Sequence, residues 1–494
     1  MRKVSETVSK AERPIKILQF GEGNFLRAFA DWMVDIANER GVLDAGIALV
    51  KPIEYGGLDA LRSQDCVYTV LLRGRQNGET AASSRVVTSI RNAVDCYTEY
   101  EDYAALAKEP ALRFIISNTT EAGIVFDKSD KLTLAPPKSY PGKLTKFLYE
   151  RWLAFDGAED KGCMVFPVEL IERNGQWLLS CCLMLCELWA LPEEFQEWLR
   201  ECNIFCQTLV DRIVTGYPKD EIAGIEEKFG YEDKMLVTGE PFALWVIESD
   251  RIEQVRGEFP LDKAGLPVVF TGDLQPYRER KVRVLNGAHT STALAAYLAG
   301  LNTVGEMMAD TETRKLLERN VYGELLPYVP LPADEVKAFA DSVMERFENP
   351  FIQHSLLSIA LNSVSKFKAR VLPTIKEAAE KTSAAPKPLC FSLAALMAFY
   401  SGEQRDGQFY GKRGDAEYEI MDDAHVIHFF AENKNLEPEE FTRKFLARAD
   451  FWGSDLNSVN GFAENVAEYL KNIREKGARE AAASMLRQEA AVSY

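Results

Sequence analysis

Short apolar segments alternate with helical segments over the first part of the chain, and this alternation constrains the fold more than any other feature. Residues 15–20 and 46–50 have the apolar, β-branched composition of buried strands, and an amphipathic helical pattern over residues 25–39 lies between them. Residues 114–117 and 164–166 predict two further short strands, each followed by turn residues and a helix. Strands that alternate with helices favour a doubly wound parallel sheet of the α/β class.

The pattern changes near residues 271–276. Before that point, residues 67–72 and 85–90 resemble an antiparallel pair around a turn-rich connection. After it, convincing strands are absent and helical spacing recurs in seven segments: residues 294–299, 311–329, 333–347, 356–369, 389–400, 438–447 and 459–471. We therefore expect an α/β domain over residues 1–275 and a mainly α-helical domain over residues 276–494.

Composition narrows the classes of partner. The 494 residues carry a formal charge of −17, which argues against a nucleic-acid binder because such proteins present a basic face. No apolar run reaches the length of a membrane span, and the N-terminus lacks the apolar core of a secretion signal. The nine cysteines form no spaced framework, which favours a reducing compartment such as the cytoplasm. We expect small-molecule partners for a monomer or small homo-oligomer, with neither nucleic acid nor membrane.

A glycine pair follows the first expected strand and opens a helix. Gly21 would permit a tight turn there, and Gly23 would let the backbone approach a pyrophosphate group. The third glycine of the usual dinucleotide pattern is missing, with Leu26 in its place, so an ordinary strand-to-helix turn is an equal alternative. The cofactor-binding candidates in this segment are Phe20, Gly21, Gly23, Asn24, Phe25 and Arg27.

A second polar segment, Asn118-Thr119-Thr120, follows a buried strand. Its amide and hydroxyls suit the ribose and phosphates of a dinucleotide, although a helix N-cap would use the same residue types. The acidic residue that usually binds the adenosine ribose is absent, because the second strand ends at Lys51 and the nearest carboxylate is Glu54. A lysine there would tolerate a 2′-phosphate, so the spacing leaves both NAD and NADP open.

Lys281, Asn286 and His289 are the catalytic candidates. On an α-helix at about 100° per residue they lie at roughly 0°, 140° and 80°, within one arc. A lysine can move a proton to or from a carbonyl or alcohol oxygen, and an amide and an imidazole can polarise that oxygen. Arg280 and Arg283 would lower the pKa of the lysine. The alternative is a half-exposed helix start with solvated charges.

Further basic residues are candidates for substrate binding. Lys366 and Arg370 are four residues apart on one helical face, where they could clamp a carboxylate or form a solvated basic surface. Arg212 follows Asp211 beside an apolar strip, which is typical of a structural ion pair. Cys202 and Cys206 share the same spacing, but no His or carboxylate cluster completes a metal site, and we expect no metal.

Together these segments resemble the polyol-specific long-chain dehydrogenase/reductase family, which includes mannitol 2-dehydrogenases, fructuronate reductases and tagaturonate reductases. The family markers fall on Lys281-x4-Asn286-x2-His289, on Gly21-x-Gly23-x-Phe25-x-Arg27-Ala28, on Asp211-Arg212-Ile213 and on Asn349, Pro350, His354, Lys366 and Arg370. The resemblance spans nearly the whole chain. It implies a Rossmann-like N-terminal domain, a helical C-terminal domain, NAD as cofactor, and Arg212 and His354 in the substrate site with Lys366 and Arg370.

Within the family, stretches such as LQFGEGNFLRAFADW and ERKVRVLNGAHT resemble the branch that interconverts tagaturonate and altronate in hexuronate breakdown. The resemblance implies that Lys281 is the general acid or base, that Asn286 stabilises the alkoxide and that His289 orients the substrate. Mannitol dehydrogenases carry a second oxyanion asparagine where this chain has Leu170, which disfavours that branch. A fructuronate reductase differs only in substrate stereochemistry and stays open. A dinucleotide-binding regulatory protein would have no use for the three catalytic candidates.

Overall fold

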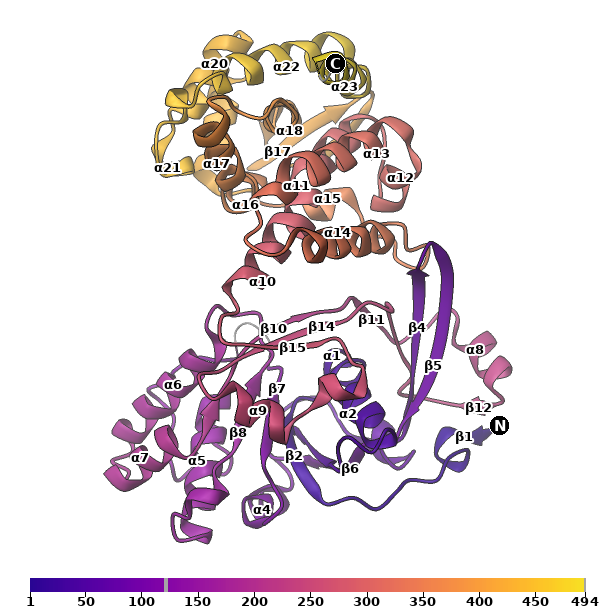
Figure 1. Ribbon diagram of the computed structural model, residues 1–494, viewed down its shortest axis with the longest axis vertical. Coiled ribbons are helices and arrows are strands. Elements are labelled where there is room, and N and C mark those ends of the chain that lie inside the picture. Colours follow the sequence, from indigo (N-terminus) through magenta and orange to yellow (C-terminus); the bar gives the residue numbers. More distant parts are fainter. Residues whose placement is uncertain (120–122, 493–494) are drawn as a thin grey trace. The chain divides into compact units, whose positions relative to one another are not determined.

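The chain forms two compact units (Figure 1). The first comprises Met1–Gly74 and Glu79–Leu274, and the second comprises Arg75–Gly78 and Gln275–Tyr494. The computed structural model describes residues 1–119 and 123–492.

The first unit is built on a six-stranded parallel sheet with the order β6-β3-β2-β7-β8-β9. Its strands are β2 (Ile15–Phe20), β3 (Gly46–Lys51), β6 (Ile90–Asp95), β7 (Phe114–Ser117), β8 (Met164–Pro167) and β9 (Ile204–Phe205). The chain runs from β2 outward to β6 and then returns to β7 on the other side of β2. This arrangement is a doubly wound Rossmann-type sheet, and the predicted fold class is confirmed.

Both faces of the sheet are buried, which explains why most residues of its strands are apolar. Ile47 and Leu49 of β3 belong to one hydrophobic cluster, whereas Ala48 and Val50 belong to the other. The helices of this unit are α1 (Asn24–Arg27), α2 (Ala30–Glu39), α3 (Asp59–Arg62), α4 (Tyr100–Ala105), α5 (Tyr140–Ala154), α6 (Asn174–Leu188), α7 (Glu193–Glu201), α8 (Ile222–Phe229) and α9 (Ile252–Glu258). Residues of α2 pack in the first cluster, and residues of α5, α6 and α7 pack in the second.

Two local expectations for this unit were wrong. The helix expected over residues 25–39 is broken at Phe29, whose φ and ψ are −128° and −83°. The Phe29 ring is buried, stacks on Phe25 at 5.0 Å and contacts Trp245 at 5.5 Å, so core packing outweighs helix continuity here. The expected turn-rich connection before residue 85 is instead strand on both sides of a two-residue turn. In that turn Asn77 and Gly78 have φ of 54° and 79°, as in a type I′ hairpin turn.

Three smaller sheets complete the first unit. Their orders are β11-β13-β4-β5, β10-β14-β15 and β1-β12. The strands are β1 (Arg2–Lys3), β4 (Tyr68–Gln76), β5 (Glu79–Val87), β10 (Gln207–Asp211), β11 (Val214–Gly216), β12 (Tyr231–Glu232), β13 (Val237–Gly239), β14 (Leu244–Glu248) and β15 (Val268–Thr271).

The second unit is mainly helical, as predicted. Its α-helices are α10 (Gln275–Arg280), α11 (Gly287–Leu298), α12 (Val304–Ala309), α13 (Thr311–Glu318), α14 (Ala333–Phe347), α15 (Leu356–Ala360), α16 (Ser363–Arg370), α17 (Leu372–Thr382), α18 (Lys387–Phe399), α19 (Ala424–Asn433), α20 (Pro438–Leu446), α21 (Ala449–Trp452), α22 (Phe462–Lys476) and α23 (Ala478–Val492). α18 is buried on nearly every side and packs against α11 and α22, so it forms the centre of this unit.

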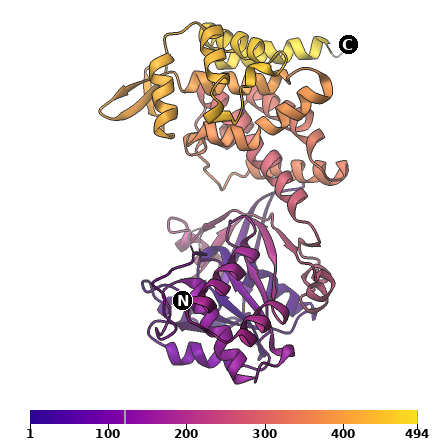
Figure 2. The same ribbon diagram turned by 90° about the vertical axis from the view of Figure 1, so that its left-hand side faces the viewer.

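Three features of this unit differ from the expectation. A three-stranded antiparallel sheet, seen at one margin of the unit in Figure 2, consists of β16 (Gly402–Arg405), β17 (Gln408–Arg413) and β18 (Ala416–Glu419). The helix expected over residues 311–329 becomes a π-helix at Arg319–Leu325. The helix expected over residues 356–369 is interrupted at Asn362, whose φ is 51°. No helix in the described part of the chain is long and apolar enough to cross a membrane.

Candidate active site

The glycine turn lies where the strand order of the parallel sheet reverses. Gly21 has a φ of 121°, and a Cβ atom added to it would lie 3.0 Å from the carbonyl oxygen of Asn118. The Asn118 N–H donates to the carbonyl of Phe20 at 3.1 Å, so the segments that follow β2 and β7 touch. Ligands of doubly wound sheets bind at this reversal, outside the carboxyl ends of the strands.

The turn leaves open space at its second glycine. A Cβ added to Gly23 would meet no heavy atom within 4 Å, which fits the close approach of a phosphate group. Arg27 is buried, donates to the Glu22 carbonyl at 3.2 Å and to Asn24 Oδ1 at 2.6 Å, and also bonds the Met235 carbonyl. The hydrogen bonds of Arg27 to Glu22 and Asn24 therefore stabilise the turn. Because space is open at Gly23, the turn fits a dinucleotide.

Lys51 is not a free cation at the end of β3. Its side chain is fully buried, its Nζ donates to the Ile53 carbonyl at 2.6 Å, and it lies 3.1 Å from the carboxylate of Asp95. Burial also raises the pKa of the nearby Glu22. Lys51 thus holds the loop after β3 and neutralises Asp95.

Thr119 is engaged with a buried carboxylate. Its N–H and its hydroxyl each donate to Glu169 Oε1 at 2.9 Å, and Ser117 donates to the other oxygen at 3.1 Å. Glu169 is 2% exposed, and its burial raises its pKa. Sequence reasoning missed this role of Glu169, although an acidic residue two positions after a buried strand was a usable signal. Thr120 lies outside the described residues.

Two further residues of the first unit bear on the predicted substrate site. All three guanidinium nitrogens of Arg212 donate to backbone carbonyls, those of Phe242, Ala28 and Pro241. The guanidinium also lies 4.3 Å from the centre of the Trp32 ring, and burial lowers its pKa to about 10. Arg212 therefore holds the fold together, and a contact with substrate stays a prediction. Leu170 is 60% exposed and supplies no polar group.

In the second unit, Lys281 and Asn286 are the first and last residues of a π-helix, whereas the sequence predicts a regular α-helix here. The N–H of Gly287 donates to the carbonyl of Val282, five residues earlier. Because π-helical hydrogen bonds join residues five apart, residues with this spacing lie one turn apart on the same side. The angle of roughly 140° expected between Lys281 and Asn286 on an α-helix is therefore wrong. The expectation that the two residues share one face of the helix agrees with the π-helix.

The two arginines that flank Lys281 are paired with carboxylates. Arg280 lies 2.7 Å from Glu335, and Arg283 lies 2.6 Å from Glu377. These carboxylates weaken the positive field that the arginines were expected to exert on the lysine. Lys281 and Asn286 are both half-buried.

His289, on the first turn of α11, lies among aromatic and basic groups. Its ring stacks on Phe347 at 4.2 Å and meets His354 edge-on at 5.1 Å. Its Nε2 atom is buried and has no hydrogen-bond partner among the described residues. Burial holds the pKa of His289 well below its usual value, and electrostatic interactions with His354, Arg346, Arg370 and Lys366 lower it further. The imidazole is therefore neutral at physiological pH.

The predicted basic pair belongs to the same cluster. Arg370 donates to Thr290 Oγ1 at 3.2 Å, one residue from His289, and Lys366 Nζ donates to the Ile359 carbonyl at 3.0 Å. Burial lowers the pKa of both side chains. The structure thus brings together four predicted residues, His289, His354, Lys366 and Arg370, and we call them the His289 cluster. Sequence reasoning did not identify Arg346 of α14, because no motif marks it.

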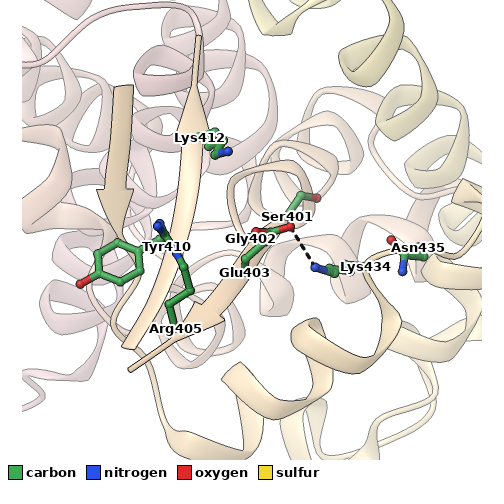
Figure 3. A pocket seen from close by; sticks show the side chains of 8 residues that line it. All are labelled: Ser401, Gly402, Glu403, Arg405, Tyr410, Lys412, Lys434 and Asn435. Carbon is green, nitrogen blue, oxygen red and sulfur yellow. Dashed lines mark hydrogen bonds and ion pairs between the residues drawn. The ribbon is translucent and has the colours of Figure 1, made fainter. Parts of the chain in front are cut away.

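A concavity of the second unit lies beside β16 and β17. It has a volume of about 240 Å³ and is lined by Ser401, Gly402, Glu403, Arg405, Tyr410, Lys412, Lys434 and Asn435 (Figure 3). Lys434 lies 3.3 Å from Glu403, and Arg405 lies 2.7 Å from Glu417, so carboxylates already neutralise two of its cations. No group of three His, Cys, Asp or Glu residues in the described part of the chain could hold a metal ion.

The chain matches known proteins over both units. Residues 15–260 match the mannitol dehydrogenase Rossmann domain, and residues 273–474 match the mannitol dehydrogenase C-terminal domain. Altronate oxidoreductase of Escherichia coli O7:K1 (strain IAI39 / ExPEC) is 45% identical over 478 residues, which cover 95% of this chain and 97% of that protein. Altronate oxidoreductase of Shigella flexneri has the same identity and coverage.

Solved structures support the same assignment of the fold. D-sorbitol dehydrogenase in substrate-free form matches with a TM-score of 0.77 at 23% identity and covers 95% of each chain. The ternary complex of Pseudomonas fluorescens mannitol 2-dehydrogenase with NAD and D-mannitol matches with a TM-score of 0.65 at 21% identity, over 97% of this chain and 96% of that one. The protein is an oxidoreductase that acts on CH–OH groups and belongs to the mannitol dehydrogenase family.

Proposed function

We propose that this protein is an NAD-dependent altronate oxidoreductase. It would reduce D-tagaturonate to D-altronate with NADH, and oxidise altronate with NAD in the reverse direction, during the breakdown of hexuronates. The 45% identity to altronate oxidoreductases over nearly the whole chain supports this choice within the family.

The observation that carries the proposal is the concentration of basic side chains around His289. His354, Arg346, Lys366 and Arg370 all act electrostatically on that one imidazole. A site that gathers several cations is suited to a substrate with a carboxylate, because a carboxylate can form charge-assisted hydrogen bonds with them. This favours a sugar acid over mannitol.

Lys281 would act as the proton donor and acceptor. When NADH is bound, it supplies a hydride to the keto carbon of tagaturonate. The Lys281 ammonium group gives a proton to the keto oxygen, which becomes the C–OH of altronate, and the reverse reaction returns that proton to the lysine amine. Asn286 donates its amide N–H to the oxygen while negative charge develops on it. With Leu170 in place of a second amide, Asn286 carries this task alone.

The other members of the site would bind and orient the substrate. His289, which is neutral, can accept or donate a hydrogen bond to a substrate hydroxyl through its unpartnered Nε2 atom. Lys366 and Arg370 are assigned to the carboxylate, and His354 to a neighbouring hydroxyl. No metal is assigned, because Lys281 is assigned as the group that handles the proton.

The cofactor would lie on the glycine turn of the first unit. Gly21 and Gly23 would receive its pyrophosphate, and Asn118 would border it. The buried pairing of Lys51 with Asp95 favours NAD, because Lys51 is not available to bind a 2′-phosphate.

Steady-state assays test this proposal. With NADH, tagaturonate should be reduced far faster than fructuronate or fructose, and NADPH should replace NADH poorly. A preference for fructuronate would move the protein to the related reductase. Activity on fructose with neither uronate would refute the proposal.

A further inference from the structure

The helix α16, which carries Lys366 and Arg370, begins with backbone N–H groups that donate to side chains from elsewhere in the chain. Asn362, the residue before α16, has a φ of 51° and makes no side-chain cap. The Ser363 N–H donates instead to the hydroxyl of Tyr400 at 3.1 Å, and the Val364 N–H donates to Asp422 Oδ2 at 3.3 Å. The N-terminus of α16 is therefore capped by residues from two other parts of the chain.

The side chains of Tyr400 and Asp422 are joined by a hydrogen bond. The Tyr400 hydroxyl donates to Asp422 Oδ2 at 2.5 Å, and the Tyr400 ring is fully buried at the end of the central helix α18. The other oxygen of Asp422 accepts the N–H of Asp423 at the start of α19. Asp422 therefore connects α16 to α18 and α19, and a shift of its carboxylate would move the first turn of α16.

Asp422 also acts on the charge of Lys366. Burial and the neighbouring Arg370 lower the pKa of Lys366, and the Asp422 carboxylate raises it. Lys366 also interacts with His289 of α11, which is neutral. The negative charge of Asp422 thus opposes the two effects that would make the lysine lose its proton.

We propose that Asp422 is a positioning residue for recognition of the substrate's carboxylate: it fixes the first turn of α16 and places its negative charge beside Lys366. The inference rests on the proposed function, since it takes Lys366 and Arg370 to be the groups that bind that carboxylate. Tyr400 anchors Asp422 through the short hydrogen bond between them.

Three variants distinguish the effect of the negative charge of Asp422 from the effect of its hydrogen bond to the first turn of α16. Asp422→Asn keeps an oxygen that can accept the Val364 N–H but removes the charge. Asp422→Glu keeps the charge. Asp423→Asn removes an equal charge from the next residue, which is exposed and makes no side-chain cap, and is the matched control. Thermal unfolding of each variant shows whether it folds.

For Asp422→Asn we expect the KM for altronate to rise about tenfold at alkaline pH, where Lys366 would lose its proton sooner than in the wild type, with the KM for NAD within twofold of the wild-type value. The alkaline limb of kcat/KM for altronate should move to lower pH by roughly one unit, because the Asp422 carboxylate no longer raises the pKa of Lys366. Asp422→Glu should restore most of this limb, and Asp423→Asn should match the wild type. If the KM and pH profile of Asp422→Asn equal those of Asp423→Asn, the inference is wrong.

A readout that needs no catalysis separates this inference from the proposed function. The rate at which an amine-reactive reagent labels Lys366, followed by mass spectrometry against pH, should have its midpoint at lower pH in Asp422→Asn than in the wild type or in Asp423→Asn. An unchanged midpoint refutes the inference, even if altronate is the substrate. Conversely, a wild-type enzyme that ignores altronate, or a Lys366→Ala variant with an unchanged KM, refutes the carboxylate assignment while the labelling shift still reports the action of Asp422.

Discussion

The two units use basic side chains in opposite ways. In the first unit, Arg212 and Lys51 are buried and donate to backbone carbonyls, so each of them holds loops in place. In the second unit, Lys366 donates to the Ile359 carbonyl, Arg370 donates to the Thr290 hydroxyl, and both interact with His289. A cation saturated by carbonyls is part of the scaffold, whereas cations that converge on an uncharged ring leave positive potential for an anionic ligand.

The largest effect should come from the lysine assigned to catalysis. Lys281→Met should lower kcat/KM for altronate by about 10²–10⁴-fold, because the proton of the alcohol loses its acceptor. The KM for NAD and the melting temperature should change little. Lys51→Met in the first unit is the contrasting variant, since it should lower the melting temperature by leaving Asp95 unpaired. Near-normal turnover in Lys281→Met would remove the lysine from the mechanism.

A comparison of two arginines tests the contrast directly. Arg370→Ala should raise the KM for altronate roughly tenfold or more, since a charge-assisted hydrogen bond contributes about 1.5–3 kcal/mol. Arg212→Ala should instead reduce the free energy of unfolding by about 2–4 kcal/mol, because one buried and two partly buried carbonyls lose their donor. Steady-state kinetics and thermal unfolding of both variants decide the matter. A stable Arg212→Ala with a raised KM would restore Arg212 as a substrate residue.

The two glycines of the turn should also behave differently. Gly23→Ala adds a methyl group into open space, so the protein should stay folded while the KM for NAD rises about tenfold. Gly21→Ala would strain a φ of 121° and press on the Asn118 carbonyl, so it should lower the melting temperature first. Unchanged NAD binding in Gly23→Ala would place the pyrophosphate elsewhere.

The smallest effect concerns a buried carboxyl group below the turn. Asp31 accepts from Tyr68 at 3.0 Å, and burial raises its pKa from 3.8 to about 7. Because the folded protein holds this proton more tightly than the unfolded chain, the stabilisation is complete below pH 3.8 and is lost as pH rises through about 7. Relative to Asp31→Asn, the wild type should lose roughly 2–5 °C in melting temperature across that window. A constant difference between the two proteins would show that Asp31 is ionised throughout.

Much of the fold could be predicted from two features of the sequence. These are the spacing of the apolar residues and the glycines and prolines that bound each segment. The parallel strands are apolar on both faces and are bounded by glycine or proline, as at Gly21 and Pro52. The sheet β16–β18 escaped prediction because its strands are short and mostly polar, and charged residues such as Glu403 and Glu417 cover its exposed face. The break at Phe29 depends on how one ring packs against Trp245, which no local pattern reports.

The candidate site was predicted in its residue types and only partly in its geometry. The spacing of Lys281 and Asn286 suggested a common face, but the π-helix that produces it has no periodic signature in the sequence. The carbonyl partners of Arg212 come from residues far away in the chain, so its motif could not show that the guanidinium is saturated. The contact of Asp422 with α16 could not be predicted for the same reason, because Asp422 and Val364 are 58 residues apart in the sequence.

The selectivity between an acidic and a neutral keto sugar tests the central claim most directly. The ratio of kcat/KM for tagaturonate to kcat/KM for fructose should be measured with NADH for the wild type and for Arg370→Ala. We expect a large ratio in the wild type that falls at least tenfold in the variant, because only tagaturonate carries the carboxylate that the His289 cluster would bind. An equal ratio in the two proteins, or a wild type that prefers fructose, would contradict it.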